Sequence, residues 1–143
     1  METLLHDIPT RGKGRVVLEK DIALWAISIL VVNRDLKLVE LRGPGLTRLN
    51  VKRTQLIDTP PRTYPATRAW GAALAMADPD LAGLSWTSRL DDRSRAFCFL
   101  AGAGRVKVGE ISLKEGPYPL AVGPMRGQLD KLCSDAGLVI AVP

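Results

Sequence analysis

The chain has 143 residues, which suits one domain that buries about two-thirds of the unfolded chain's surface. Its 46% hydrophobic and 24% charged residues lie near globular averages, and this excludes a chain that is disordered throughout. The net charge of +5 permits an anionic partner (a phosphate-bearing cofactor, a nucleic acid or an acidic protein), but no block of five like charges is present.

The first half of the chain alternates short apolar segments with basic or glycine-containing loops. Residues 19–29 are apolar nearly all round, which indicates a buried helix or a segment that is partly strand, because periodicity does not separate the two. Residues 36–41 (LKLVEL) alternate with period two and predict a strand with mixed faces. We also expect a short helix-compatible segment, a basic loop and one helical turn, at residues 2–7, 10–16 and 46–50.

The second half carries the strongest helix signals. A helix is predicted to start at Tyr64-Pro65, since proline suits the first helical position, and to stop at Pro79; its spacing places Trp70 in the core. A second helix is predicted over residues 125–136. Strands are predicted at 84–88, 96–100, 106–113 and 138–142, with AGAGR (101–105) as a hairpin turn.

The order of these elements favours a single α+β domain over residues 1–143 rather than a regular parallel α/β sheet. Cys98 and Cys133 lie in apolar patterns without the spacing of a metal site or a disulfide framework, so we expect buried, reduced thiols and a cytoplasmic protein. His6 is the only histidine, and no metal is expected. The longest apolar run is about half a membrane span, so we expect no membrane association.

Five segments occur in an order and spacing that resemble the RES domain, a family of toxins from bacterial toxin–antitoxin pairs that is named for an Arg, a Glu and a Ser. The resemblance spans residues 2–113 and depends on the succession of segments rather than on any one motif. The segments are ETLLHDIP (2–9), RDLKLVELRGPGLTRL (34–49), TYPATRAWGAAL (63–74), GLSWTSR (83–89) and AFCF (96–99).

The resemblance implies an ADP-ribosyltransferase-like fold of the diphtheria-toxin type, with mixed or antiparallel sheets and flanking helices. It also implies an activity that breaks the nicotinamide–ribose bond of NAD, with phosphate, water or a protein side chain as acceptor. The family's Glu matches Glu2 and its Ser matches Ser88. The family's Arg lies upstream of the Glu, so we expect the chain to correspond to the larger, C-terminal part of a complete domain.

These residue types suit that chemistry. Cleavage of an N-glycosidic bond passes through an oxocarbenium-like state, which a fixed carboxylate such as Glu2 stabilises. A hydroxyl at a strand end, Ser88, can hydrogen-bond the ribose or the nicotinamide amide and hold the reactive conformer. The candidates for binding NAD are Tyr64, Trp86 and Arg89.

Each of these three has a second interpretation. Tyr64 either stacks on a ring of NAD or packs at the start of its helix, and Trp86 either walls the pocket or belongs to the core. Arg89 carries a guanidinium that suits a pyrophosphate. It does not simply replace the family's Arg, because successive strand residues point to opposite faces and Arg89 follows Ser88 directly.

Three functions remain open from the sequence. The first is an NAD-degrading toxin whose partner is an antitoxin protein of the helix-turn-helix type. The second is a catalytically dead RES module that binds an antitoxin. The third, a small basic nucleic-acid binder, ranks last because the basic residues are scattered, so no direct contact with nucleic acid is expected. Strand edges left exposed in a truncated domain also predict a homodimer or an obligate complex.

Overall fold

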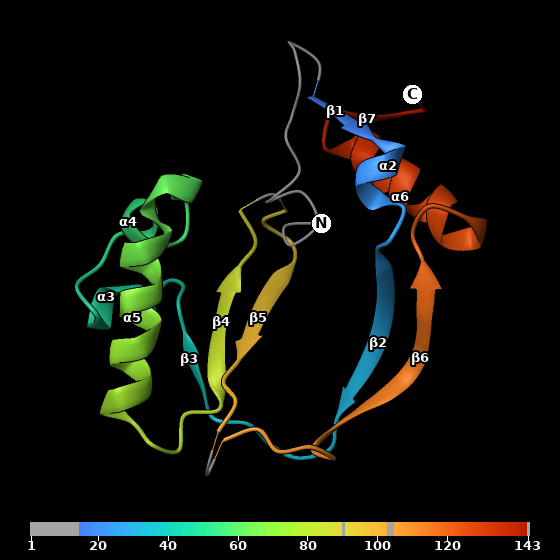
Figure 1. The fold of residues 1–143 in the computed structure, drawn as a ribbon. Coiled ribbons are helices and arrows are strands. Elements are labelled where there is room, and N and C mark those ends of the chain that lie inside the picture. The colour runs from blue at the N-terminus through green and yellow to red at the C-terminus, as the bar shows by residue number, and fades with distance from the viewer. Residues whose placement is uncertain (1–14, 90, 103–104, 143) are drawn as a thin grey trace. The chain divides into compact units, whose positions relative to one another are not determined.

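The computed structural model describes residues 15–89, 91–102 and 105–142. The chain divides into two compact units: unit 1 is Met1–Val31 with Ser112–Pro143, and unit 2 is Val32–Ile111. Both units contain helices and strands, so the predicted α+β class is confirmed (Figure 1). None of the helices in the described ranges combines the length and apolar character that crossing a bilayer requires.

Unit 1 has a small apolar core between two paired strands and a helix. β1 and β7 pair in parallel, and α6 contributes Leu129 and Cys133 to the core beneath them. The elements of this unit, of which β2 and β6 each extend one residue into unit 2, are β1 (Arg15–Leu18), α2 (Glu19–Ile22), β2 (Ala26–Val32), β6 (Ile111–Pro119), α6 (Gly123–Asp135) and β7 (Leu138–Ala141). The buried residues of the core are Val17, Ile22, Leu120, Leu129, Cys133 and Leu138.

The C-terminal helix and strand agree with their predictions. α6 ends where Gly137 adopts φ +68°, a left-handed conformation that glycine takes without steric cost. The Arg126 guanidinium donates to Glu19 at 2.7 Å and to Asp130 at 3.0 Å, which ties the first turns of α6 to α2. The predicted helix at 125–136 and the strand after it are therefore confirmed.

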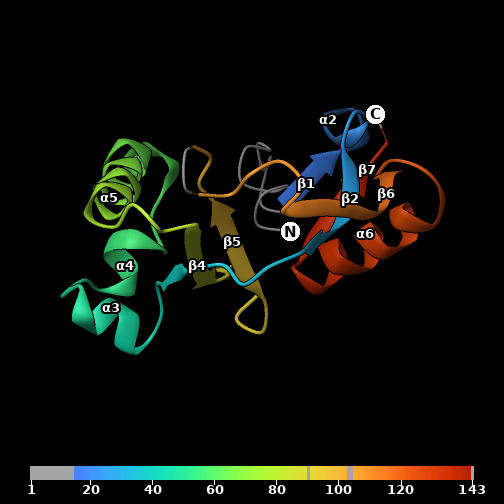
Figure 2. The same ribbon diagram turned by 90° about the horizontal axis from the view of Figure 1, so that it is seen from below.

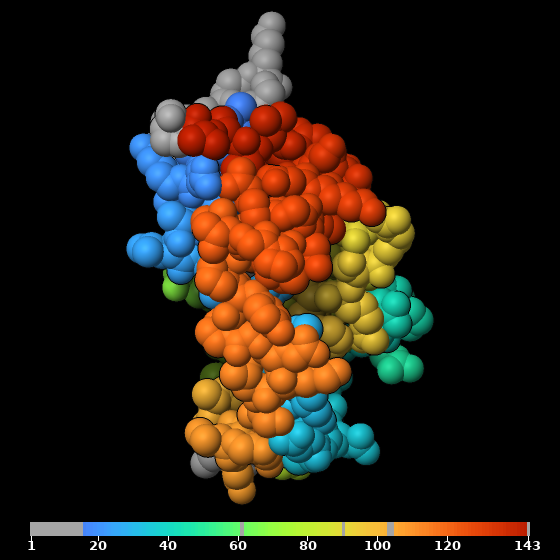
Figure 3. All heavy atoms as spheres, turned by 90° about the vertical axis from the view of Figure 1, so that its right-hand side faces the viewer, coloured from blue at the N-terminus to red at the C-terminus, as the bar shows by residue number. Residues whose placement is uncertain are grey.

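The segment at 19–29 divides between α2 and β2, which confirms the alternative that it is partly strand. The β-branched residues from Ile27 onward favour the strand, and every residue of β2 is exposed. β2 pairs with β6 in a two-stranded sheet, in which the two strands run side by side in opposite directions (Figure 1). β6 and α6 form one face of the unit (Figure 3). The alternative of a buried helix is wrong, because α2 ends at Ile22 and every residue of β2 is exposed.

The strand predicted at 106–113 lies further along the chain than expected, since β6 spans Ile111–Pro119. β6 begins at Ile111, because residues 107–110 form a turn in which Glu110 N–H donates to the Lys107 carbonyl at 3.1 Å. The hairpin turn predicted at 101–105 lies partly outside the described residues; beside it, Val106 N–H donates to the Leu100 carbonyl at 3.3 Å, and Ala101 and Val106 form an isolated parallel bridge.

Unit 2 is a three-stranded sheet with helices on one side of it (Figures 1 and 2). The strand order is β3-β4-β5, with β3 parallel and β5 antiparallel to β4. Its elements are β3 (Leu38–Glu40), α3 (Pro44–Arg48), α4 (Arg53–Leu56), the 3₁₀ turn η1 (Pro61–Thr63), α5 (Tyr64–Ala77), β4 (Gly83–Thr87) and β5 (Arg95–Phe99). Leu41, Leu46 and Leu56 form its buried core.

Three residues of unit 2 test the sequence predictions directly. α5 starts at Tyr64, as predicted, but Trp70 is 37% exposed and lies outside the core. The helix is apolar on nearly all sides, so spacing alone did not identify the side that faces the sheet. Cys98 was expected to be buried and is exposed, because β5 is the last strand of the sheet.

Candidate functional site

Ser88 lies one residue beyond the end of β4, and both its side chain and its backbone are held. It is 6% exposed, its N–H donates to the Ser94 carbonyl at 2.9 Å, and its Oγ accepts a hydrogen bond from the Asp91 N–H at 3.3 Å. The hydroxyl proposed to contact the substrate is therefore fixed by the turn that joins β4 to β5.

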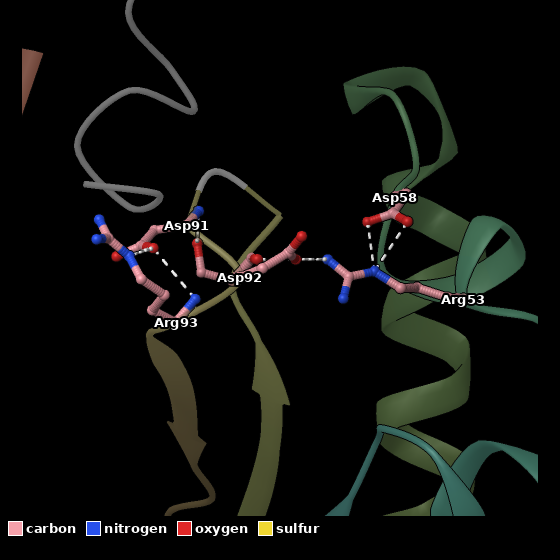
Figure 4. Close-up of polar contacts among 6 residues, drawn as sticks. Arg53, Asp58, Asp91, Asp92 and Arg93 are labelled. Carbon is pink, nitrogen blue, oxygen red and sulfur yellow. Dashed lines mark hydrogen bonds and ion pairs between the residues drawn. The ribbon is translucent and has the colours of Figure 1, made fainter. Parts of the chain in front are cut away.

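Asp91 organises this turn. Its carboxylate accepts hydrogen bonds from the Ser94 hydroxyl at 2.5 Å and from the backbone N–H and Nε of Arg93, each at 3.1 Å (Figure 4). These donors, the Ser94 hydroxyl first and then Arg93, stabilise the charged carboxylate and lower the pKa of Asp91 from 3.8 to about 2. Asp91 is thus ionised whenever the turn is formed near neutral pH.

A second contact to Ser88 comes from Arg53, at the start of α4. Its Nη2 donates to the Ser88 carbonyl at 3.3 Å and to Asp92 Oδ1 at 3.1 Å. Its Nε donates to both carboxylate oxygens of Asp58, at 3.0 and 2.9 Å (Figure 4). Hydrogen bonding to Asp58 raises the pKa of Arg53 above its already high value. One guanidinium therefore joins α4 to the exit of β4 while lying between two carboxylates.

Arg53 was not found from the sequence. It lies in KRTQL, at residues 52–56, where nothing distinguishes it from the other scattered basic residues. The distance of 35 positions between Arg53 and Ser88 also exceeds the reach of any local motif. Only the packing of α4 beside the end of β4 brings them together.

The structure places the other predicted residues as follows. Arg89 lies past the end of β4, and its Nη1 donates to the Thr59 carbonyl at 2.9 Å. Trp86 packs against the buried core of unit 2, a position that accounts for its partial burial. Tyr64 is the first residue of α5 and is half-buried. Glu2 lies outside the described residues, so its convergence with Ser88 stays a prediction.

Strand alternation predicts that Arg89 and Ser88 face opposite ways. β4 ends at Thr87, so both residues belong to the turn rather than to the strand, and the alternation argument does not extend to them. Within the described ranges, no group of three or more His, Cys, Asp or Glu residues is placed to hold a metal ion.

A family model, that of the RES domain, matches residues 1–121 of the chain. The match includes Glu2 and Ser88 and extends through all of unit 2. No curated protein and no solved structure matches the chain.

Proposed function

The chain belongs to the RES domain family, and on that premise we propose that it is the toxin of a bacterial toxin–antitoxin pair and cleaves the nicotinamide–ribose bond of NAD. The observation that carries the proposal is the family match, which takes in both Glu2 and Ser88. The acceptor is phosphate or water, giving NAD degradation, or a protein side chain, giving ADP-ribosylation. An ADP-ribosyltransferase-like fold is part of the same proposal.

Each residue has a distinct part in the proposed reaction. As the bond to nicotinamide lengthens, positive charge develops on the ribose, and the Glu2 carboxylate stabilises that charge. Ser88 positions the dinucleotide by a hydrogen bond to the ribose or to the nicotinamide amide. The hydrogen bond that the Ser88 N–H donates and the one that its carbonyl accepts support this, because a fixed backbone helps to position a hydroxyl.

Arg53 does not take the place of the family's upstream Arg in this proposal. A guanidinium that binds pyrophosphate must bring net positive charge to it, whereas Arg53 lies between Asp58 and Asp92. The three groups together carry one net negative charge, which repels an anion. We assign Arg53 the role of positioning Ser88.

Loss of NAD, followed by chromatography of the nucleotide products, tests the activity. We expect Glu2→Gln and Ser88→Ala each to lower the rate about 100-fold, by removal of charge stabilisation and of positioning respectively. Ser134→Ala, at an exposed position of α6, is the matched control and should leave the rate unchanged. Equal rates in all four proteins would show that the NAD loss does not depend on this site.

A binding module without catalysis is the second candidate, and β2 is the observation that favours it. Its seven residues are apolar except for Ser28, and all are exposed. Such a strand suits contact with an antitoxin of the helix-turn-helix type or with a second copy of the chain. No NAD loss by the wild-type chain, combined with a stable complex with the product of a neighbouring gene, would decide for this candidate.

A further inference from the structure

The face of the unit 2 sheet that points away from the helices carries a second group of polar and aromatic side chains. Alternation along the strands sends Val39, Leu84 and Trp86 to the core on the helix side. The register places Glu40 beside Ser85 and Ser85 beside Phe97 on the other face. We call this face, formed by Glu40, Arg42, Ser85, Arg95, Phe97 and Phe99, the Arg–Phe face.

Its polar part consists of two guanidinium groups that share one carboxylate. Arg42 Nε donates to Glu40 Oε1 at 2.6 Å, and Arg95 Nη2 lies 3.4 Å from the same oxygen. Arg95 Nη2 also donates to Ser85 Oγ at 3.0 Å, and Ser85 is only 1% exposed. Hydrogen bonding to Arg42 lowers the pKa of Glu40, so the carboxylate is charged and holds both guanidinium groups in place.

The balance of charge differs from that around Arg53. Two guanidinium groups and one carboxylate leave one net positive charge on the Arg–Phe face. Arg95 uses Nη2 for both of its bonds, and its Nε and Nη1 groups make no hydrogen bond to a described residue. This face therefore has donors and charge for an anion, and phosphate is one of the anions whose geometry matches a guanidinium group.

The aromatic part lies directly beside these donors. Phe97 and Phe99 have their ring centroids 6.4 Å apart with an interplanar angle of 12°, and they are 49% and 38% exposed. The Arg95 guanidinium carbon lies 5.4 Å from the Phe97 ring centroid. Residues two apart on a strand share a face, and the two nearly parallel rings are both partly exposed, so each offers an aromatic surface on which a planar base can stack.

We propose that the Arg–Phe face binds a nucleotide, with its base stacked on Phe97 and Phe99 and its phosphates bound by Arg42 and Arg95. This inference extends the proposed function: the nucleotide is the adenosine diphosphate half of NAD. A single pair of rings and a single pair of guanidinium groups match one nucleotide, whereas a nucleic-acid strand requires a longer basic groove.

Titration calorimetry of the full chain with ADP tests the inference, with adenosine, inorganic pyrophosphate, NAD and a single-stranded oligothymidine as separate probes. Arg95→Gln should weaken ADP binding about tenfold and leave adenosine nearly unaffected. Phe97→Leu should weaken both about tenfold through lost stacking. Arg48→Gln, an exposed arginine on α3, is the matched control and should bind ADP like the wild type.

The outcomes separate this inference from the proposed function. ADP binding that is absent, or is unchanged in both variants, overturns the inference even if the chain consumes NAD. ADP binding with the expected losses supports it even if no NAD is consumed. Oligothymidine that binds more tightly than ADP and displaces it would assign the face to nucleic acid instead. Thermal melting of each variant identifies one that fails to fold, and the Arg95 and Phe97 variants test the face independently.

Discussion

Two clusters of unit 2 contain the same kinds of group in opposite proportions. At the exit of β4, one guanidinium, Arg53, lies between the carboxylates of Asp58 and Asp92. On the Arg–Phe face, one carboxylate, Glu40, lies between the guanidinium groups of Arg42 and Arg95. The first cluster has a net negative charge and repels anions, so it serves to fix the backbone of Ser88. The second has a net positive charge and Arg95 donors without a described partner, so it is suited to bind an anion.

We expect the largest effect on stability from adding a side chain at Gly83 of β4, where the neighbouring strands β3 and β5 leave no room for one. A Cβ on Gly83 would overlap the Cys98 carbonyl oxygen and lie 3.0 Å from Leu38 Cδ2. Gly83→Ala should therefore lower the free energy of unfolding by about 1–3 kcal/mol. Urea denaturation measures this, with Gly127→Ala as the control, because a Cβ at Gly127 in α6 meets no atom within 4 Å. Equal stability of the two variants would mean that β3, β4 and β5 do not pack as described.

Arg53→Ala compared with Arg42→Ala tests the difference between the clusters. Removal of Arg53 leaves two carboxylates without their shared partner and removes a donor from the Ser88 carbonyl. We expect a loss of about 1 kcal/mol in unfolding free energy, since the Arg53 side chain is 35% exposed, and about a tenfold drop in NAD turnover. Arg42→Ala should leave stability nearly unchanged and weaken ADP binding. The reverse pattern would exchange the roles assigned to the two clusters.

Glu40→Gln and Asp92→Asn each remove one negative charge, one from each cluster. On the Arg–Phe face the change raises the net charge from one positive to two, and binding of inorganic pyrophosphate at low salt should strengthen about two- to fivefold. At Arg53 the change brings the cluster only to neutrality, so Asp92→Asn should leave pyrophosphate binding as it is. Calorimetry at two salt concentrations measures both. Equal strengthening in the two variants would contradict a distinct binding face.

The smallest effect concerns acid stability of the turn that holds Ser88. The pKa of Asp91 is about 2 in the folded chain and 3.8 ordinarily. The unfolded chain therefore takes up this proton first, and the stability contributed by Asp91 is complete above about pH 4 and lost as the pH falls toward 2. Asp91→Asn should lower stability at neutral pH and flatten its decline between pH 4 and 2. Asp135→Asn, in α6, is the control; Asp135 forms no ion pair with a described residue. A decline as steep in Asp91→Asn as in the wild type would remove Asp91 from this role.

The sequence predicted those elements that local signals encode. The proline at the start of α5, the glycine after α6 and the apolar run of β4 each act within a few residues, and each element forms within about two residues of its predicted bounds. The predictions of burial were less successful. Trp70 and Cys98 lie in apolar stretches but are exposed, because burial depends on which element packs against which side.

The family followed from the order of segments along the chain, which requires no knowledge of contacts, and the same order supplied Ser88 as a candidate. The two charge clusters did not follow from it, because each contains a pair that is distant in sequence, Arg53–Asp92 at 39 positions and Glu40–Arg95 at 55, which meets only through pairing and packing. Parallel pairing of β3 with β4 sets Glu40 beside Ser85, and the antiparallel register of β5 brings Arg95 and Phe97 to the same face. Local propensity determines that a segment is a strand, whereas register and partner determine which side chains meet. The sequence therefore indicated what chemistry to expect, and the tertiary structure alone decided which arginines hold Ser88 and which are available to bind an anion.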